Sequence, residues 1–397
     1  MIERLSLWSM WVFAFSIPWE KTILLGELGS IARILGTLAF VLTVSAILYR
    51  RYLRPLVLSH AFLILFVMWA AISYFWSPDA EASAEAIFTL LQLGLMSILI
   101  WNVCSERHSQ RRMLQAYVLG ACVSSISTFI MFRSAQEFSY QRYAAEGFDP
   151  NDLGLVLAIS IPMSYFLSLH CKGTVVWLYR MAIVLAVCAI GLTASRTAML
   201  ATIAGLVIVP LTLRAVSRTQ KIVLVGICLV GSAVAATLIP PESWERFGTT
   251  LSEIQHGDLN NRLTFWGAAW RMAVAHPLQG VGVGTFGIVA TGMVGFADKP
   301  IVVHNTFLSV LAETGAVGLL LFVSLLATLI KALTELDSEQ RALWIAVLLT
   351  WGVGVSALSW ENRKPTWLLF SLILVQCASG AAKRIRGHSG AQEVLAR

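Results

Sequence analysis

Long apolar runs recur along almost the whole chain and limit what it can fold into. Twelve of them come near the roughly 20 residues that a helix needs to cross a membrane, and they span residues 5–19, 29–48, 56–76, 84–104, 113–132, 151–169, 175–193, 197–213, 222–239, 310–330, 341–359 and 366–382. Charged residues are only 13% of the 397 residues and apolar ones are 57%, which leaves too little polar surface for a soluble domain and excludes disorder. We therefore expect an all-α polytopic integral membrane protein with about 12 transmembrane helices.

The basic residues predict how this protein is oriented. With the N-terminus in the cytoplasm, 17 of the 29 Lys and Arg residues fall in cytoplasmic segments, 11 fall outside, and Arg180 alone lies inside a span. The positive-inside rule favours this orientation. It places both termini in the cytoplasm, including a tail at 383–397, and makes residues 1–397 a single transmembrane domain. The net charge of +7 then reflects topology, so we expect no nucleic-acid partner.

One outer segment is much longer than the others, a loop of about sixty residues at 240–303. Long loops without a domain of their own tend to be functional. Within this loop, Asn261–Ala275 has apolar residues at helical spacing, which predicts an amphipathic helix lying at the outer membrane interface. The tryptophans of the loop suit the headgroup belt.

The remaining composition argues against metal and disulfide chemistry. The six cysteines lie in or beside apolar runs and form no CxxC pair, so neither a disulfide framework nor a zinc site is expected. The sequence also lacks HExxH and paired acidic motifs. We expect a reaction that needs no metal and no cofactor.

The outer arginines are the first candidates for chemistry. Arg196 lies in GLTASRTAML between two apolar spans, where a charge usually faces a cavity or a partner; snorkelling to headgroups is the alternative. Arg246, Arg262 and Arg271 share the long loop and could each be a solvated or lipid-facing residue. Together they form a basic cluster on the outer face, and because arginine binds phosphate bidentately, such a cluster suits a phosphorylated lipid.

His304 is the sharpest single candidate, at the point where the long loop re-enters the membrane. A histidine titrates near neutral pH and can act as a general base, although a lone histidine is more often a satisfied polar residue. Glu313 falls on roughly the opposite helix face, where pairing with an arginine is a plausible structural role. The glycine-rich segment Gly280–Phe286 could bring backbone N–H groups to a phosphate, but it matches no Walker or dinucleotide pattern, and a tight turn is the simpler interpretation.

Three stretches together resemble the O-antigen ligase and polymerase superfamily of bacterial envelope glycosyltransferases. They are GLTASRTAML, with its Ser-Arg element; NRLTFWGAAWRMAVAHPLQGVGVGTF, with an Arg-xxx-Trp helix and a glycine-rich turn; and VHNTFLSVLAETGAVGLLLF, with a His-Asn-xx-Leu-xx-Leu-x-Glu-x-Gly-xx-Gly signature. A weaker match is QRYAAEGFDPND, through Arg142, Gly147 and Asn151. The resemblance covers roughly residues 140–330.

The resemblance implies a GT-C-like fold and a role for each matched residue. Arg196 and Arg262 would bind the diphosphate of an undecaprenyl-diphosphate-linked O-antigen donor. His304 would be the base, or the acceptor-positioning group, at the acceptor hydroxyl. Further contacts to the diphosphate or the acceptor are expected from Arg142, Arg246, Arg271, Asn305 and Glu313. The enzyme would work at the periplasmic face of the bacterial inner membrane, among membrane lipids.

Several functions remain open at this stage. A ligase that joins O-antigen to lipid A-core is favoured over a polymerase, because the chain has one principal outer loop and no large C-terminal domain. A lipid-linked sugar flippase or transporter is the rival from another class, although transporters tend to have polar sites at the membrane midplane. A purely structural membrane scaffold would leave His304 and the outer arginines unexplained.

Overall fold

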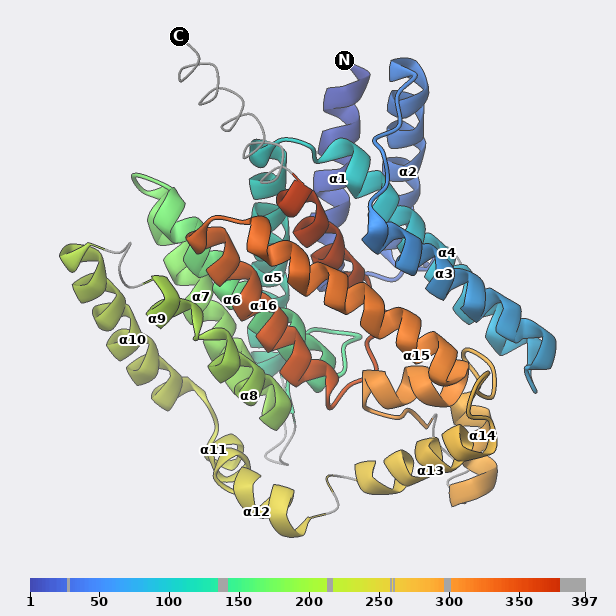
Figure 1. Ribbon diagram of the computed structural model, residues 1–397. Helices are drawn as coiled ribbons and strands as arrows, with labels where there is room; N and C mark the ends of the chain where they lie inside the picture. The colour runs from blue at the N-terminus through green and yellow to red at the C-terminus, as the bar shows by residue number, and fades with distance from the viewer. Residues whose placement is uncertain are drawn as a thin grey trace.

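The computed structural model of the protein is almost wholly helical (Figure 1). It describes residues 1–26, 29–134, 142–212, 217–257, 259, 261–295 and 301–378, and within these ranges there is no β-strand beyond an isolated bridge. The helices in chain order are α1 (Ile2–Ser16), α2 (Ile31–Arg50), α3 (Leu58–Ile72), α4 (Ala80–Val103), α5 (Arg107–Ser134), α6 (Pro150–His170), α7 (Val175–Thr193), α8 (Arg196–Gly205), α9 (Ile208–Thr212), α10 (Arg218–Leu238), α11 (Pro241–Gly248), α12 (Thr250–His256), α13 (Arg262–Ala275), α14 (Phe286–Val294), α15 (Thr306–Ala332), α16 (Ser338–Val355) and a C-terminal helix, Lys364–Ala378.

Each of the twelve predicted ranges overlaps a helix, which confirms an all-α, multi-pass membrane architecture. Within the described part of the chain, seven helices are long and apolar enough to cross a membrane, namely α2, α3 with the turn that follows it, α4, α5, α6, α7 and α15. The range 197–213 is divided between α8 and α9. The number twelve and the GT-C-like class remain predictions, and the predicted tail at 383–397 lies outside the described residues.

Two helices form the centre of the bundle. Every residue of α6 from Leu153 to Ser168 is buried, and so is every residue from 365 to 377 in the C-terminal helix. A helix that is apolar all round is stable only when it is surrounded by other helices, and α6 is enclosed by α5, α7, α8 and α16. Asp149 begins α6 by accepting the N–H groups of Asn151 and Asp152, a stabilising N-cap.

The long helix α15 is broken at one residue, Gly315, whose φ of 67° and ψ of −171° are not helical. The break lets the segment after α13 enter the helix groove, where the N–H of Ala316 donates to the carbonyl of Pro277 (2.8 Å) and that of Val317 to the carbonyl of Leu278 (3.4 Å). A Cβ at Gly315 would lie 2.3 Å from the carbonyl carbon of Leu278. The glycine is therefore required by both backbone conformation and space.

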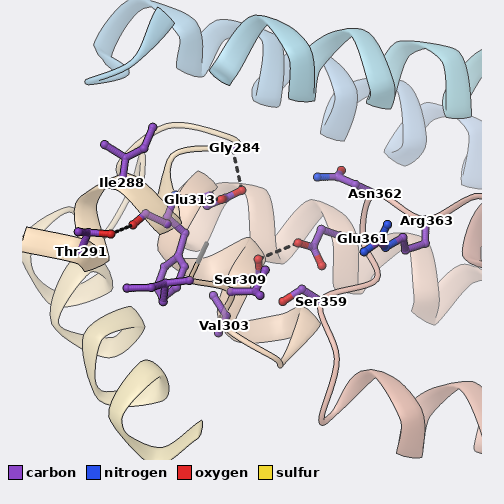
Figure 2. Close-up of a pocket in the computed structure, with 14 residues that line it drawn as sticks. Gly284, Ile288, Thr291, Val303, Ser309, Glu313, Ser359, Glu361, Asn362 and Arg363 are labelled. Carbon is purple, nitrogen blue, oxygen red and sulfur yellow. Dashed lines mark hydrogen bonds between the residues drawn. The ribbon is translucent and has the colours of Figure 1, made fainter. Parts of the chain in front are cut away.

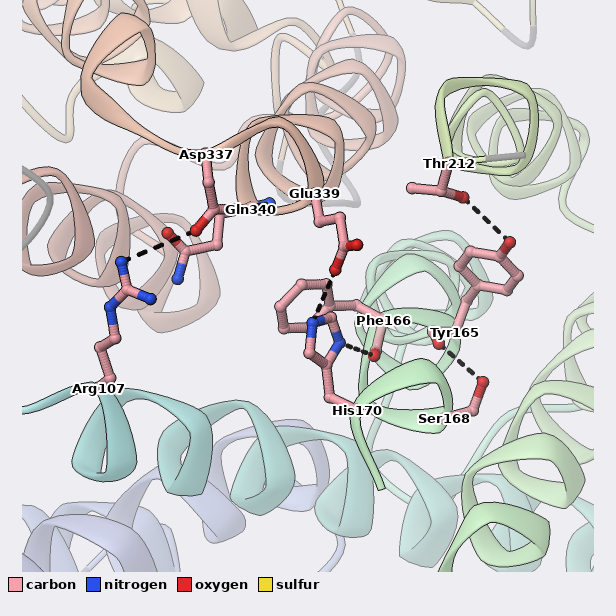
Figure 3. A network of polar contacts seen from close by, with 9 residues as sticks. All are labelled: Arg107, Tyr165, Phe166, Ser168, His170, Thr212, Asp337, Glu339 and Gln340. Carbon is pink, nitrogen blue, oxygen red and sulfur yellow. Dashed lines mark hydrogen bonds and ion pairs between the residues drawn. The ribbon is translucent and has the colours of Figure 1, made fainter. Parts of the chain in front are cut away.

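The bundle has two different ends. Helices α11–α14 lie together at the end away from the N-terminus (Figure 1). We use the term loop end for these four helices and the connections 17–26, 142–149 and 356–363. Ion pairs tie these connections to each other, since Asp152 pairs with both Lys21 and Arg363. The opposite end has its own polar contacts, in which His170 pairs with Glu339 (Figure 3).

Helix α13 confirms the helix predicted at Asn261–Ala275. The sequence pattern did not show which face of this helix is buried. Its buried face consists of small or flexible residues, Ala268, Ala269, Met272 and Ala273. The larger apolar side chains of Leu263, Trp270 and Val274 are exposed. An exposed apolar stripe of this kind suits a lipid-facing or interfacial position.

Arg180, which the sequence left unplaced inside a span, lies in the first turns of α7. Its side chain is buried, its guanidinium carbon lies 5.0 Å from the centre of the Trp177 ring, and its Nε has no hydrogen-bond partner. The ring face supplies a cation–π contact. Among the residues that the structure describes, no hydrogen bond or ion pair joins Arg180 to the loop end.

The break in α15 generates a stability prediction. We expect Gly315→Ala to lower the free energy of unfolding by at least about 2 kcal/mol, because it adds left-handed strain and overpacking. Gly352→Ala in α16 is the matched control, since a Cβ there meets nothing within 4 Å and alanine favours the helix. The measurement is thermal unfolding of both variants in nanodiscs. Equal stability of the two variants would contradict the role given to the break.

Candidate functional site

The turn that carries His304 is held from both sides. His304 has a left-handed backbone, with φ of 55°, which is uncommon for a residue other than glycine. Asn305 caps α15 through its side-chain oxygen and donates its amide N–H to the carbonyl of Ser356 (3.1 Å). Thr306 Oγ1 donates to the carbonyl of Leu358 (2.9 Å). The histidine therefore occupies a strained, fixed corner between α15 and the segment after α16.

The charges around His304 come from the starts of two other helices, α13 and α6. Burial lowers the pKa of His304 below the ordinary 6.5, and the positive charge of Arg262 lowers it further. Asp149 and Asp152, at the start of α6, oppose this by raising the pKa. The imidazole is therefore neutral at neutral pH, the form that can accept a proton.

Arg262 lies at the first position of α13. It directly follows Asn261, another residue with a left-handed backbone (φ 65°). Burial lowers the pKa of Arg262, the charge of Asp149 raises it, and the charge of Arg246 lowers it. Arg262, His304 and Asp149 are thus close enough to influence one another, so the structure brings together the helix and the turn that the second and third sequence motifs predicted.

Asp152 organises the neighbouring segments of the loop end. Its carboxylate pairs with Lys21 (3.5 Å) and Arg363 (3.1 Å) and accepts a hydrogen bond from the indole of Trp360 (2.9 Å). These partners come from the connection after α1 and the segment after α16. One carboxylate at the start of the central helix thereby fixes two distant segments beside His304.

Arg142 joins the weaker motif to the Ser-Arg motif. Its guanidinium donates to the carbonyl of Thr193 (3.0 Å) and to the side-chain oxygen of Asn151 (2.7 Å). The same oxygen of Asn151 accepts from Ser195 Oγ (2.9 Å), and Ser195 is the N-cap of α8. Arg142 therefore stabilises the start of α8, where Arg196 is the first residue after the N-cap.

Arg196 is fully engaged by α11 and α12. Its Nε donates to the carbonyl of Arg246 (2.9 Å), one terminal nitrogen donates to Thr249 Oγ1 (2.7 Å), and the other pairs with the carboxylate of Glu253 (3.2 Å). The guanidinium is mostly enclosed, with 18% of the side chain exposed. Its anionic partner here is a carboxylate of the chain itself.

The other two loop arginines differ in position. The charge of Arg246 acts on Arg262, and its Nε is buried without a hydrogen bond, so Arg246 belongs to the same cluster. Arg271 is exposed on α13. Among the described residues, no hydrogen bond or ion pair joins Arg271 to Arg262 or His304.

The glycine-rich turn is bound from within the protein, chiefly by Glu313. The Glu313 carboxylate accepts the N–H groups of Gly284 (2.9 Å) and Phe286 (3.2 Å), and its backbone carbonyl accepts that of Gly282 (2.9 Å). Figure 2 shows the contact with Gly284. The N–H groups of the other turn residues also donate to protein oxygens, those of Gly280, Val281, Val283 and Thr285. The turn is thus a structural element here, and Glu313 bonds to its backbone instead of to the predicted arginine.

Sequence reasoning missed the acidic members of this site, which are Asp149, Asp152 and Glu253, together with Arg363. A signal existed for the first two, because they flank the Pro-Asn pair in the stretch that contains Arg142. Glu253 and Arg363 had none, since each is defined by a partner more than fifty residues away in the chain. No group of three or more His, Cys, Asp and Glu side chains is arranged to hold a metal among the described residues.

These features define a multi-pass helical membrane protein with a cluster of arginines and one histidine at its loop end. In a comparison with known families, the family model described as O-Antigen ligase matches residues 181–323 of the chain. This match confirms the resemblance to the O-antigen ligase and polymerase superfamily, and it spans Arg196, Arg262 and His304 but not Arg142. The family implies lipid-linked polysaccharide substrates in a membrane. A search of curated proteins found no match.

The bonding of Glu313 leads to a prediction. Glu313→Gln offers one acceptor oxygen where two N–H groups point, so one buried donor is left unpaired. We expect the free energy of unfolding to fall by roughly 1–3 kcal/mol. Glu85→Gln, which changes an exposed glutamate of α4, is the control. The measurement is denaturant or thermal unfolding in nanodiscs, and a Glu313→Gln variant as stable as the control would refute this bonding.

Proposed function

We propose that the protein is a glycosyltransferase that moves O-antigen polysaccharide from undecaprenyl diphosphate to a sugar of lipid A-core. The reaction takes place at the periplasmic face of the inner membrane and completes lipopolysaccharide. The family match supports a function of the O-antigen ligase or polymerase class. The observation that carries the proposal is the fixed corner that holds His304, where the charge of Arg262 acts on the imidazole, because it unites a phosphate-binding group with a proton acceptor.

In this proposal the arginines stabilise the negative charge of the leaving group. When the bond between the anomeric carbon and the diphosphate breaks, negative charge grows on the diphosphate oxygens. Preorganised cations in a partly buried site stabilise such charge strongly, and a guanidinium can bind two phosphate oxygens at once. Arg262 is the primary candidate, with Arg246 beside it and Arg196 at the start of α8, so the proposed reaction is metal-independent.

In this proposal His304 removes the proton of the acceptor hydroxyl. A neutral imidazole accepts the proton of the acceptor hydroxyl while the oxygen forms its bond to the anomeric carbon. In the same step the bond from that carbon to the diphosphate breaks, and undecaprenyl diphosphate leaves. Attack from the face opposite the leaving group inverts the anomeric configuration.

Arg196 needs a change of partner before it can bind a phosphate. Glu253 now supplies the anionic oxygen that pairs with its guanidinium (3.2 Å). A phosphate oxygen can replace that carboxylate, since both are anionic acceptors for the same donor. Donor binding is therefore coupled to the position of α12 in this proposal.

The first test uses three variants of the purified, nanodisc-embedded protein. We expect His304→Ala to reduce glycan transfer about 10²–10⁴-fold, the usual contribution of a general base, and Arg262→Ala or Arg196→Ala about 10²–10³-fold. Arg133→Ala removes an exposed arginine at the end of α5 and is the control. The substrates are a lipid-diphosphate glycan and lipid A-core. Transfer at the control rate by all three variants would reject the assignment.

The products of the wild-type protein decide the class of reaction. Attachment of glycan to lipid A-core supports the ligase, whereas polymer growth without lipid A-core identifies a polymerase. Movement of lipid-linked sugar across the vesicle without transfer identifies a flippase.

The pKa of His304 predicts the pH dependence of transfer. Because that pKa is below 6.5, the neutral base is present at neutral pH and is lost as the pH falls through the lowered pKa. We expect the acid limb of the rate profile to lie below pH 6.5. Asp149→Asn keeps an N-cap but removes a charge that raises the pKa, so its acid limb should move to still lower pH. An acid limb above pH 6.5 in the wild type, or a shift of the limb to higher pH in Asp149→Asn, would contradict the proposal.

A further inference from the structure

A cavity lies beside the His304 turn and has no part in the mechanism above. It has a volume of about 620 Å³ and is lined by residues of α14, the turn 301–303, the first turns of α15 and the segment 359–363 (Figure 2). This volume is within the range of roughly 300–1,000 Å³ that is typical of pockets for small molecules. The cavity is therefore large enough to bind a ligand.

One wall of the cavity carries polar atoms that lack partners. Glu361 is only 8% exposed; its Oε1 accepts from Ser309 Oγ (2.7 Å), but its Oε2 is buried without a hydrogen bond. Ser359 Oγ and Asn362 Oδ1 are likewise buried and unpaired. Buried polar atoms are nearly always satisfied by protein, water or ligand. Three such atoms within the four residues 359–362 indicate a site that is completed by a hydrogen-bond donor.

The charge of the wall determines what kind of ligand fits. Two acids, Glu313 and Glu361, line the cavity, and Arg363, also in the wall, pairs with Asp152. Burial raises the pKa of Glu361, and the hydrogen bond from Ser309 opposes that rise. A wall of carboxyl, hydroxyl and amide acceptors repels phosphate and accepts hydrogen bonds from hydroxyl groups.

The lining also includes apolar side chains, those of Phe286, Ile288, Ile301 and Val303. A pyranose ring has an apolar C–H face and a rim of hydroxyl groups, so it matches a cavity lined by both apolar side chains and hydrogen-bond acceptors. Pockets of this type use a few placed polar groups to orient a ligand against apolar side chains.

The cavity is physically connected to the proposed reaction centre. Val303, which lines it, directly precedes His304, and Ser309 lies on the helix that begins after His304. Arg363, at its edge, pairs with Asp152, whose charge acts on His304. A ligand in the cavity therefore contacts the same turn that presents the base.

We propose that this cavity is a subsite for a neutral sugar ring, whose hydroxyl groups donate to Glu361, Ser359 and Asn362. The inference rests on the proposed function, because the sugar belongs to one of the two glycans of the transfer reaction. The acceptor core and the donor glycan offer the same ring chemistry. The experiment separates these sources.

Direct binding tests the subsite without catalysis. The probes are free glucose, galactose and N-acetylglucosamine, with ethanolamine and inorganic phosphate as charged comparisons, added to the nanodisc-embedded protein and followed by saturation-transfer NMR. At least one sugar should bind, and Glu361→Gln should weaken its binding about tenfold or more, since an amide places an NH₂ donor where an unpaired acceptor oxygen stands. Glu85→Gln is the control. Ser359→Ala and Asn362→Ala serve in the same way if Glu361→Gln does not fold.

Kinetics identify the source of the sugar. The KM of the acceptor at saturating donor, and the KM of the donor at saturating acceptor, are measured for the wild type and Glu361→Gln. A rise of about tenfold in only one KM with kcat little changed supports the subsite and assigns it to that substrate. An unchanged KM for both substrates overturns it, and so does a binding signal from ethanolamine or phosphate alone. Sugar binding that depends on Glu361 without any transfer would reject the proposed function and leave the subsite standing.

Discussion

The contact between the Glu313 carboxylate and the glycine-rich turn is the interaction on which the loop end depends. By accepting the N–H groups of Gly284 and Phe286, it fixes the start of α14 against α15. Just after the break at Gly315, the carbonyls of Pro277 and Leu278 accept hydrogen bonds from the N–H groups of α15. These contacts join the segment after α13 to α15 at both ends of a single helical turn, and so set the position of α13 relative to the turn that carries His304.

A second constraint comes from the start of α6. Asp149 is the N-cap of this largely buried helix and Asp152 lies in its first turn. Both charges act on His304, and that of Asp149 also acts on Arg262. Arg262, Lys21 and Arg363 thus lie around acids at the start of the central helix α6. This arrangement compensates for the cost of keeping several arginines half-buried, because an unpaired buried charge is strongly destabilising.

The sequence predicted helices in all twelve apolar ranges, since apolar runs of this length have few alternatives in a chain with so few charges. It also singled out Arg196, Arg262 and His304 through three local motifs. Their roles in the reaction remain a proposal. The sequence did not predict that Glu313 bonds to a backbone turn, or that Arg196 pairs with Glu253, because both contacts join segments that are separated by tens of residues.

Local patterns therefore determined the elements of this protein, its membrane character and the residues worth attention, because hydrophobic periodicity and helix capping act over a few residues. Only the tertiary structure decided which side of α13 is buried, which acids face the arginines, and where a cavity forms beside His304. Those outcomes depend on how side chains from distant segments fill space and satisfy one another's hydrogen bonds, and no stretch of sequence contains both partners.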